Sequence, residues 1–301
     1  MDNDNALVEA ARNLYKGLRF GIKYRGVKVL EAEAGNELAR AAILRGEPFV
    51  FGRCGATEMR TVADWLEHGG HFTDRTRQDI QNLSGVFPTD DVTLVRFCQY
   101  YVDCVHNADL LALWDVGAER QVIRECRGTL FTKLRALEPY YHAQPWSAAL
   151  AGKKVLVVHP FKATILQQYA RREQLFPGTQ ILPEFASLTV VQAVQGLAGQ
   201  KTGYNSWFDA LAAMEAEMDA ADYEVAIIGA GAYGLPLATH ARDTGHVAIQ
   251  MSGATQLLFG IKGKRWDDHP VIGKLYNDAW VRPAESEGIA RRETVEGGSY
   301  W

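Results

Sequence analysis

The stretch Glu224–Trp266 most constrains what this chain can fold into. Four apolar residues, Val225–Ile228, are followed at once by a glycine turn and then by a helical pattern that runs to about residue 244. A short, continuous apolar run is typical of a strand buried on both faces of a parallel sheet. The stretch therefore predicts strand, tight turn and helix. The turn residues that we expect around a ligand are Gly229, Gly231, Tyr233 and Gly234.

Two interpretations of the glycine turn remain open. A helix N-terminus opened by glycines directs bare N–H groups and the positive end of the helix dipole at one point, which suits a phosphate or a pyrophosphate. The same glycines can instead serve only the close packing of the helix against the strand. The turn alone does not separate a nucleotide site from a packing device.

The spacing Gly-x-Gly-x-x-Gly is also the dinucleotide fingerprint. In NAD sites it is joined by an acidic residue about 20 positions further on, at the end of the next strand. Here the next strand, expected over 246–251, ends with Gln250, Ser252 and Gly253 and carries no acid. We therefore expect no NAD, and an NAD(P)-dependent oxidoreductase is the less favoured alternative.

A basic loop, Gly260–Trp266, follows that strand. Three cations among glycines predict a loop that closes over a phosphate-bearing ligand, although a solvated surface loop is the alternative. The next residues, Asp267–His269, could offer metal ligands, but a solvated turn is favoured there. The residues expected on the diphosphate are Ser252, Gln256, Lys262, Lys264 and Arg265.

A second informative motif lies at the other end of the chain. Phe49–Phe51 predict a short strand, glycines break it, and a helix restarts at residue 56. Arg53, Gly55 and Glu58 thus lie where that strand ends and the helix begins, and ligands bind at this edge of open α/β sheets. The alternative for Glu58 is a charge that merely favours the helix N-terminus.

The construction occurs a third time in the middle of the chain. Lys154–Val158 predict a buried strand that ends in a polar turn before a helix extending to about residue 175. Because parallel strands end at one edge of a sheet, the polar residues of this turn should face the same crevice. These residues are His159, Lys162 and Thr164.

Strands alternate with helices along the whole chain, which predicts an α/β fold. We expect a Rossmann-like, mostly parallel sheet with helices on both faces, preceded by a helical N-terminal segment. We expect four parts: 1–47 helical, 48–150 a first α/β half, 151–280 a second, nucleotide-binding half, and 281–301 a tail that docks on the body or on a second subunit. Further helices are expected over 5–20, 29–45, 73–85, 91–107, 118–127, 129–141 and 206–221, with Thr89 or Asp90 and Asn205 as caps, and further strands over 109–114 and 181–194.

Composition limits the function classes. The chain has 301 residues, of which 47% are hydrophobic and 23% charged, with a formal net charge of −4. It can bury a large core, and the charge gives no general attraction to nucleic acid, which we do not expect as a partner. Four cysteines without paired spacing predict reduced thiols. We expect neither a signal peptide nor a membrane-spanning segment, and a location in the cytoplasm or at the inner face of the membrane.

Taken together, these motifs resemble the bacterial GT-D type glycosyltransferases. The resemblance rests on Arg53-x-Gly55-x-x-Glu58 after a strand and on the late strand, glycine turn and helix beginning Tyr-Gly-Leu-Pro-Leu-Ala. It covers residues 48–266 in layout and implies transfer of a sugar from a nucleotide sugar, with UDP-sugars favoured, to a glycan or lipid-linked acceptor in surface-polysaccharide assembly. It implies Arg53 and Glu58 at the reacting centre.

The family's acidic pair departs here, because Ala56 stands where the resemblance implies a metal-binding aspartate. Three alternatives stay open for Glu58: a weak Mn²⁺ or Mg²⁺ site completed by diphosphate oxygens, the catalytic base, or a protein that has lost catalysis. Without a metal, Lys262, Lys264 and Arg265 would replace its charge on the leaving diphosphate. No haem is expected. A non-catalytic nucleotide-sugar-binding protein is the principal alternative, and a homo-oligomer is allowed.

Overall fold

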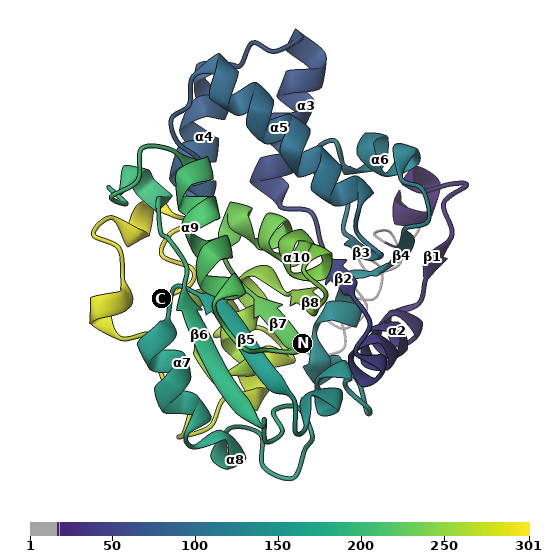
Figure 1. The fold of residues 1–301 in the computed structure, drawn as a ribbon, viewed down its shortest axis with the longest axis vertical. Coiled ribbons are helices and arrows are strands. Elements are labelled where there is room, and N and C mark those ends of the chain that lie inside the picture. The colour runs from purple at the N-terminus through teal and green to yellow at the C-terminus, as the bar shows by residue number, and fades with distance from the viewer. Residues whose placement is uncertain (1–16, 18) are drawn as a thin grey trace, which may run out of the picture.

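The computed structural model describes residue 17 and residues 19–301, so the helix expected over 5–20 lies almost wholly outside the described residues. One sheet of eight parallel strands forms the centre of the molecule, in the order β1-β4-β3-β2-β8-β7-β5-β6 (Figure 1). The expected α/β, Rossmann-like fold is confirmed. The strands are β1 Val29–Leu30, β2 Phe49–Gly52, β3 Leu110–Leu113, β4 Leu130–Lys133, β5 Lys154–His159, β6 Ser187–Gln192, β7 Val225–Ile228 and β8 Val247–Gln250.

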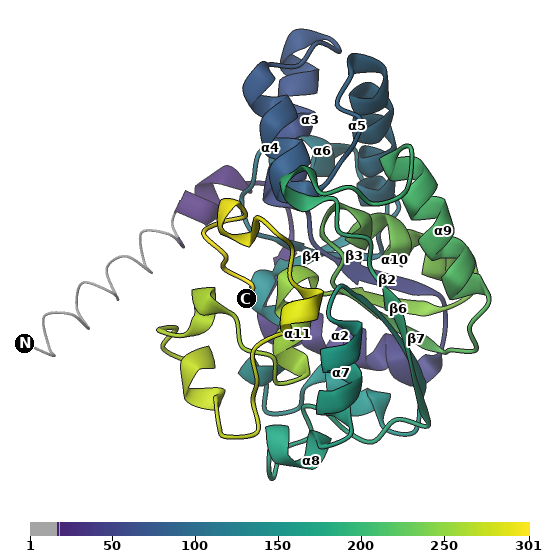
Figure 2. The same cartoon turned by 90° about the vertical axis from the view of Figure 1, so that its left-hand side faces the viewer.

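Helices cover both faces of this sheet, as Figures 1 and 2 show. Successive side chains of the central strands alternate between two cores, so Leu156 and Val158 face one layer whereas Val155 and Val157 face the other. This explains why the strands read as unbroken apolar runs. The helices are α2 Ala32–Arg45, α3 Ala56–His68, α4 Asp74–Ser84, α5 Asp91–His106, α6 Glu119–Val122, α7 Lys162–Tyr169, α8 Arg172–Leu175, α9 Trp207–Asp219, α10 Gly234–Asp243 and α11 Thr255–Leu258.

Local signals placed most helix starts correctly. Asp90 caps α5 by accepting a hydrogen bond from the backbone N–H of Thr93, as expected from its position before the apolar pattern. The cap of α9 is Ser206 rather than Asn205, a shift of one residue. Expected helix ends also agree within a few residues, which is the usual accuracy of such boundaries.

The expected helix over 129–141 is wrong. Residues 130–133 form strand β4, which lies between β1 and β3, and short 3-10 turns follow it. The apolar and charged residues of this stretch fit a helical period, but pairing along the full length of β3 decided the structure. β1 is likewise a strand of two residues within the stretch expected to be helical from residue 29.

The chain changes direction between two neighbouring strands, β5 and β7. From β5 it crosses outward to the edge strand β6, whereas from β7 it crosses toward the centre to β8. Right-handed crossovers then place the following helices on opposite faces, with Ile165 of α7 in one core and Leu237 of α10 in the other. A crevice opens at the carboxyl end of the sheet at such a switch point.

A membrane span is not found among the described helices, because none of them combines enough length with enough apolar character.

Candidate functional site

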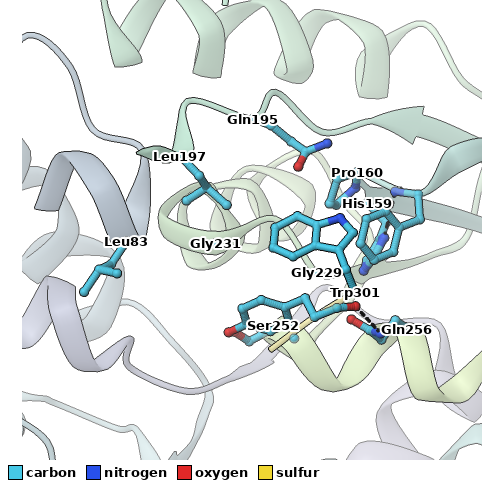
Figure 3. Close-up of a pocket in the computed structure, with 13 residues that line it drawn as sticks. Leu83, His159, Pro160, Gln195, Leu197, Gly229, Gly231, Ser252, Gln256 and Trp301 are labelled. Atoms are coloured by element: carbon cyan, nitrogen blue, oxygen red, sulfur yellow. Dashed lines mark hydrogen bonds between the residues drawn. The ribbon is translucent and has the colours of Figure 1, made fainter. Parts of the chain in front are cut away.

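A cavity of about 90 Å³ lies at this switch point, between the carboxyl ends of β5 and β7. His159 and Gly229 come from the two strand ends, and Gly231 follows in the glycine turn. Figure 3 shows the indole of Trp301 lying over these residues. Of the residues expected around the nucleotide and diphosphate, the cavity wall contains His159, Gly229, Gly231, Ser252 and Gln256.

The three glycines of the turn have different structural roles. A β-carbon on Gly229 would lie 2.6 Å from Oγ1 of Thr255 and 2.8 Å from Cδ2 of His159, so no side chain fits there. Gly231 has φ of 54°, a left-handed conformation that favours glycine. A β-carbon on Gly234 would lie 3.1 Å from the side chain of Gln250. Two of the glycines therefore serve close packing, and Gly231 shapes the turn toward the cavity.

Tyr233 does not contribute to this cavity, which corrects the sequence-based expectation. Its ring stacks on Trp207 with centroids 4.8 Å apart and planes within 6°, and it is 2% exposed. Tyr233 belongs to the core under α9 and α10, where it packs with Trp207, the first residue of α9.

His159 is a neutral donor at the cavity wall. Its side chain is buried, and burial lowers its pKa to about 3. Nδ1 accepts a hydrogen bond of 3.0 Å from the backbone N–H of Phe161. In the neutral imidazole the proton then lies on Nε2, so His159 can donate one hydrogen bond to a ligand without adding charge.

The other two residues of that turn are differently placed. Thr164 is buried, and its hydroxyl and backbone N–H bind the carboxylate of Glu287, which also accepts a bond of 2.6 Å from the backbone N–H of Ala163. Glu287 therefore occupies the N-terminus of α7, where we expected a ligand. Lys162 is the first residue of α7 and is partly exposed.

Arg53 and Glu58 lie where the second motif placed them, beyond β2 and in the first turn of α3. The guanidinium of Arg53 lies 4.5 Å from the ring centroid of Trp114, a cation–π contact. Glu58 is 6% exposed, and its carboxylate folds back over Gly55, which leaves no room for a side chain there. Burial raises the pKa of Glu58, while hydrogen bonds from its own backbone and from Ser84 and the charge of Arg53 oppose that rise.

Contacts connect this motif to the glycine turn. The backbone N–H of Arg53 donates to Oε1 of Gln250 over 2.8 Å. Ser84, whose side chain helps to lower the pKa of Glu58, has its carbonyl oxygen 4.0 Å from the position that a β-carbon on Gly231 would take. The carboxylate and the glycine turn therefore lie at the same edge of the sheet, although 173 positions separate Glu58 from Gly231 in the sequence.

The cations of the basic loop point in different directions. Lys262 lies 5.4 Å from the ring centroid of Tyr276, away from the cavity. Arg265 pairs with Glu296 over 3.2 Å. Lys264 lines a second hollow of about 290 Å³, and Trp301 borders both this hollow and the cavity. The loop thus reaches the site, but the segment that ends in Trp301 lies between the loop and the cavity.

Sequence reasoning missed several residues at this edge. Glu138, in a turn after β4, has its pKa raised to about 7 by burial, and the charges of Arg53, Arg135 and His142 oppose the rise. No motif marks this residue, since only the fold brings it to Arg53. Two aromatics after two glycines did indicate a tail that docks back, and Trp301 does so. The other residues that sequence reasoning missed are Leu83, Ser84, Gln195, Leu197 and Glu287.

The donor sets for a metal or for NAD are incomplete. Among residues 17 and 19–301, no group of three histidine, cysteine, aspartate or glutamate side chains is placed to hold a metal ion. Glu58 is the only acid of its motif, because Ala56 supplies no donor. At the end of β8, where an acid would bind the ribose of NAD, Gln250 is buried and accepts the hydrogen bond from Arg53.

Comparison of the chain with protein-family models, with curated proteins and with solved structures found no match.

Proposed function

We propose that the protein is a glycosyltransferase that moves a sugar from a nucleotide sugar, with a UDP-sugar favoured, to a glycan or lipid-linked acceptor of bacterial surface-polysaccharide assembly. The observation that carries the proposal is the convergence of two distant motifs on one edge of the sheet. Near the ends of β2 and β8, the backbone N–H of Arg53 donates to Gln250, whose side chain also packs against Gly234 of the glycine turn. Ser84, which lowers the pKa of Glu58, has its carbonyl oxygen near Gly231. A parallel sheet binds nucleotides at such a switch point.

In this proposal the nucleotide lies against Gly229, Gly231 and His159, with its phosphates toward Lys264 and Arg265. The bond from the anomeric carbon of the sugar to the diphosphate breaks, and the acceptor oxygen bonds to that carbon. The acceptor proton passes to Glu58, whose raised pKa suits a general base, and Arg53 lies beside it. The cations stabilise the charge that develops on the leaving diphosphate.

A divalent metal does not fit the residues present. The only carboxylate of the motif, Glu58, is folded onto Gly55, and the residue two positions earlier is Ala56, which has no donor. We therefore derive no step through Mn²⁺ or Mg²⁺. The positive charge comes from the side chains of the basic loop in this mechanism.

Calorimetric titration with UDP and with GDP tests the proposal. We expect binding in the micromolar to millimolar range that Lys264→Ala weakens about tenfold, because a charged hydrogen bond to phosphate contributes about 1.5–3 kcal/mol. Lys28→Ala is the matched control, since Lys28 is exposed and precedes β1 at the opposite edge. No binding of either nucleotide would contradict the proposal. A thermal-shift screen of nucleotide sugars with and without Mn²⁺ then identifies the donor.

A non-catalytic nucleotide-sugar-binding protein is the second candidate. The burial of Glu58 at 6% exposure favours it, because a base must reach the acceptor hydroxyl. Incubation with nucleotide sugars and a panel of metals separates the two candidates. Hydrolysis of the nucleotide sugar or transfer of its sugar supports the enzyme, and binding without turnover supports the non-catalytic binding protein.

A further inference from the structure

Residues 296–301, here called the strap, lie against the crevice that we assign to the nucleotide, and Tyr300 and Trp301 line its cavity. In the strap, Glu296 provides a carboxylate, and Tyr300 and Trp301 provide two aromatic rings. Glu296 pairs with Arg265 over 3.2 Å, and the Trp301 ring meets Phe161 edge-on with centroids 6.2 Å apart. Figure 3 shows Trp301 among the residues of the cavity.

The strap binds the same groups that a nucleotide would use. The backbone N–H groups of Lys264 and Arg265 donate to the carbonyl oxygens of Trp301 and Ser299, over 3.3 Å and 3.1 Å. The amide of Gln256 donates to the carbonyl oxygen of Tyr300 over 3.1 Å. An anion on Arg265 and a flat ring beside His159 reproduce the main features of a nucleotide phosphate and base.

Two features of the docked strap weaken its hold on the rest of the protein. The Arg265–Glu296 pair is exposed on both sides, at 41% and 47%, and exposed ion pairs contribute little to stability. Nε1 of Trp301 and Oε1 of Gln195 are both buried without a hydrogen-bond partner among the described residues. The docked position therefore leaves one donor and one acceptor unsatisfied, and undocking would release both.

The strap also begins with a flexible connection. Glu296, Gly297 and Gly298 have φ of 49°, 69° and 74°, so three successive residues are in the left-handed region. Glycine reaches this region and many others without strain, which allows the strap to swing about residues 297–298. Glu296 is not glycine, and its conformation carries strain that is released when the strap leaves.

We propose that the strap is an internal occupant of the crevice, and that a nucleoside diphosphate must displace it, its phosphate replacing Glu296 on Arg265 and its base replacing Trp301. The inference rests on the proposed function, because it concerns the same crevice. Displacement would also expose Oε1 of Gln195, which has no hydrogen-bond partner among the described residues. The other side-chain atom of this amide, Nε2, donates to the carbonyl oxygen of Glu287 over 3.2 Å and so fixes the direction in which Oε1 points. A ring N–H of the base can then pair with that oxygen.

Calorimetry with UDP on the full chain and on the double variant Glu296→Ala/Trp301→Ala tests the displacement. The apparent Kd equals the intrinsic Kd divided by the fraction of molecules whose crevice is open. If the crevice is open in about one wild-type molecule in ten, we expect the double variant to bind UDP about tenfold more tightly. Trp301→Phe keeps a ring in the crevice and removes the unpaired N–H, so it should not bind UDP more tightly than the wild type does. Glu47→Ala is the matched ion-pair control, since Glu47 pairs with Arg45 over 3.0 Å before β2, at the opposite edge.

The outcomes separate the inference from the function. If UDP binds more tightly to the double variant than to the wild type, and the Trp301→Phe and Glu47→Ala variants show no such gain, the strap occupies the crevice as proposed. Equal or weaker binding in a folded double variant, with UDP binding to the wild type, overturns the inference and leaves the proposed function intact. UDP binding to none of the proteins overturns both.

Amide hydrogen exchange gives a second, independent measurement on the wild type. Saturating UDP should speed exchange at the N–H groups of Lys264 and Arg265, because their acceptors are carbonyl oxygens of the strap. Slower exchange at both amides would show that the strap closes over the ligand and would overturn the inference.

Discussion

The backbone N–H of Arg53 donates a hydrogen bond to Oε1 of Gln250 over 2.8 Å, although the two residues are 197 positions apart in the chain. This bond joins the end of β2 to the end of β8, and so joins the first motif to the half of the molecule that carries the glycine turn. Gln250 is 3% exposed, and its side chain also packs against Gly52 and Gly234.

Replacing Gln250 with alanine should therefore lower the free energy of unfolding by about 1–3 kcal/mol, since the buried N–H of Arg53 loses its acceptor. Urea denaturation measures the change. Gln99→Ala is the control, because Gln99 is exposed on α5 and should change stability by less than about 0.5 kcal/mol. Equal effects of the two substitutions would contradict a structural role for this bond.

Gly229→Ala should destabilise the fold by about 1–3 kcal/mol through overpacking against Thr255 and His159. Gly21→Ala is the matched control, because a β-carbon there meets nothing within 4 Å and alanine favours a helix. Urea denaturation of both variants gives the comparison. A Gly229→Ala protein as stable as the wild type would show that the turn can open without cost.

His159 should make the fold less stable as the pH falls, because its side chain takes up a proton in the unfolded chain before it does so in the folded protein. Its pKa is lowered from 6.5 to about 3 in the folded protein, so the unfolded chain binds the proton more tightly between these values. Stability then decreases by about 1.4 kcal/mol per unit as the pH falls below 6.5, or about 2 kcal/mol at pH 5. Unfolding of the wild type and of His159→Gln should be measured at pH 7 and pH 5. Between these pH values the wild type should lose about 2 kcal/mol more stability than the variant does, because glutamine does not titrate.

The carboxyl of Glu138 should change stability in the opposite direction to His159, and over an overlapping pH range. Its pKa is raised from 4.5 to about 7, so it contributes stability that is fully present below pH 4.5 and is lost as the pH rises toward 7. Glu138→Gln keeps the side chain neutral and should make the stability of the protein fall less over that range. A difference between variant and wild type that does not change from pH 4.5 to pH 7 would contradict this assignment. Glu67→Gln, at an exposed position, is the control.

The sequence by itself determined the fold class and the buried central strands, but not β1 and β4. Unbroken apolar runs such as Val225–Ile228 can be satisfied only between two layers of helices, and each run ends in a turn that fixes where the strand stops. For the same reason the positions of Arg53, His159 and Gly229 at strand ends were predictable, because local signals mark the end of each strand.

Tertiary structure decided which side chains meet. Residues 130–133 became a strand because β3 offered them a partner, and Tyr233 entered the core because it stacks on Trp207. Glu287 reached the N-terminus of α7, and Tyr300 and Trp301 reached the crevice, through contacts between segments far apart in the sequence. Such pairings depend on how distant surfaces fit together, and the periodicity of one segment holds no information about its partner.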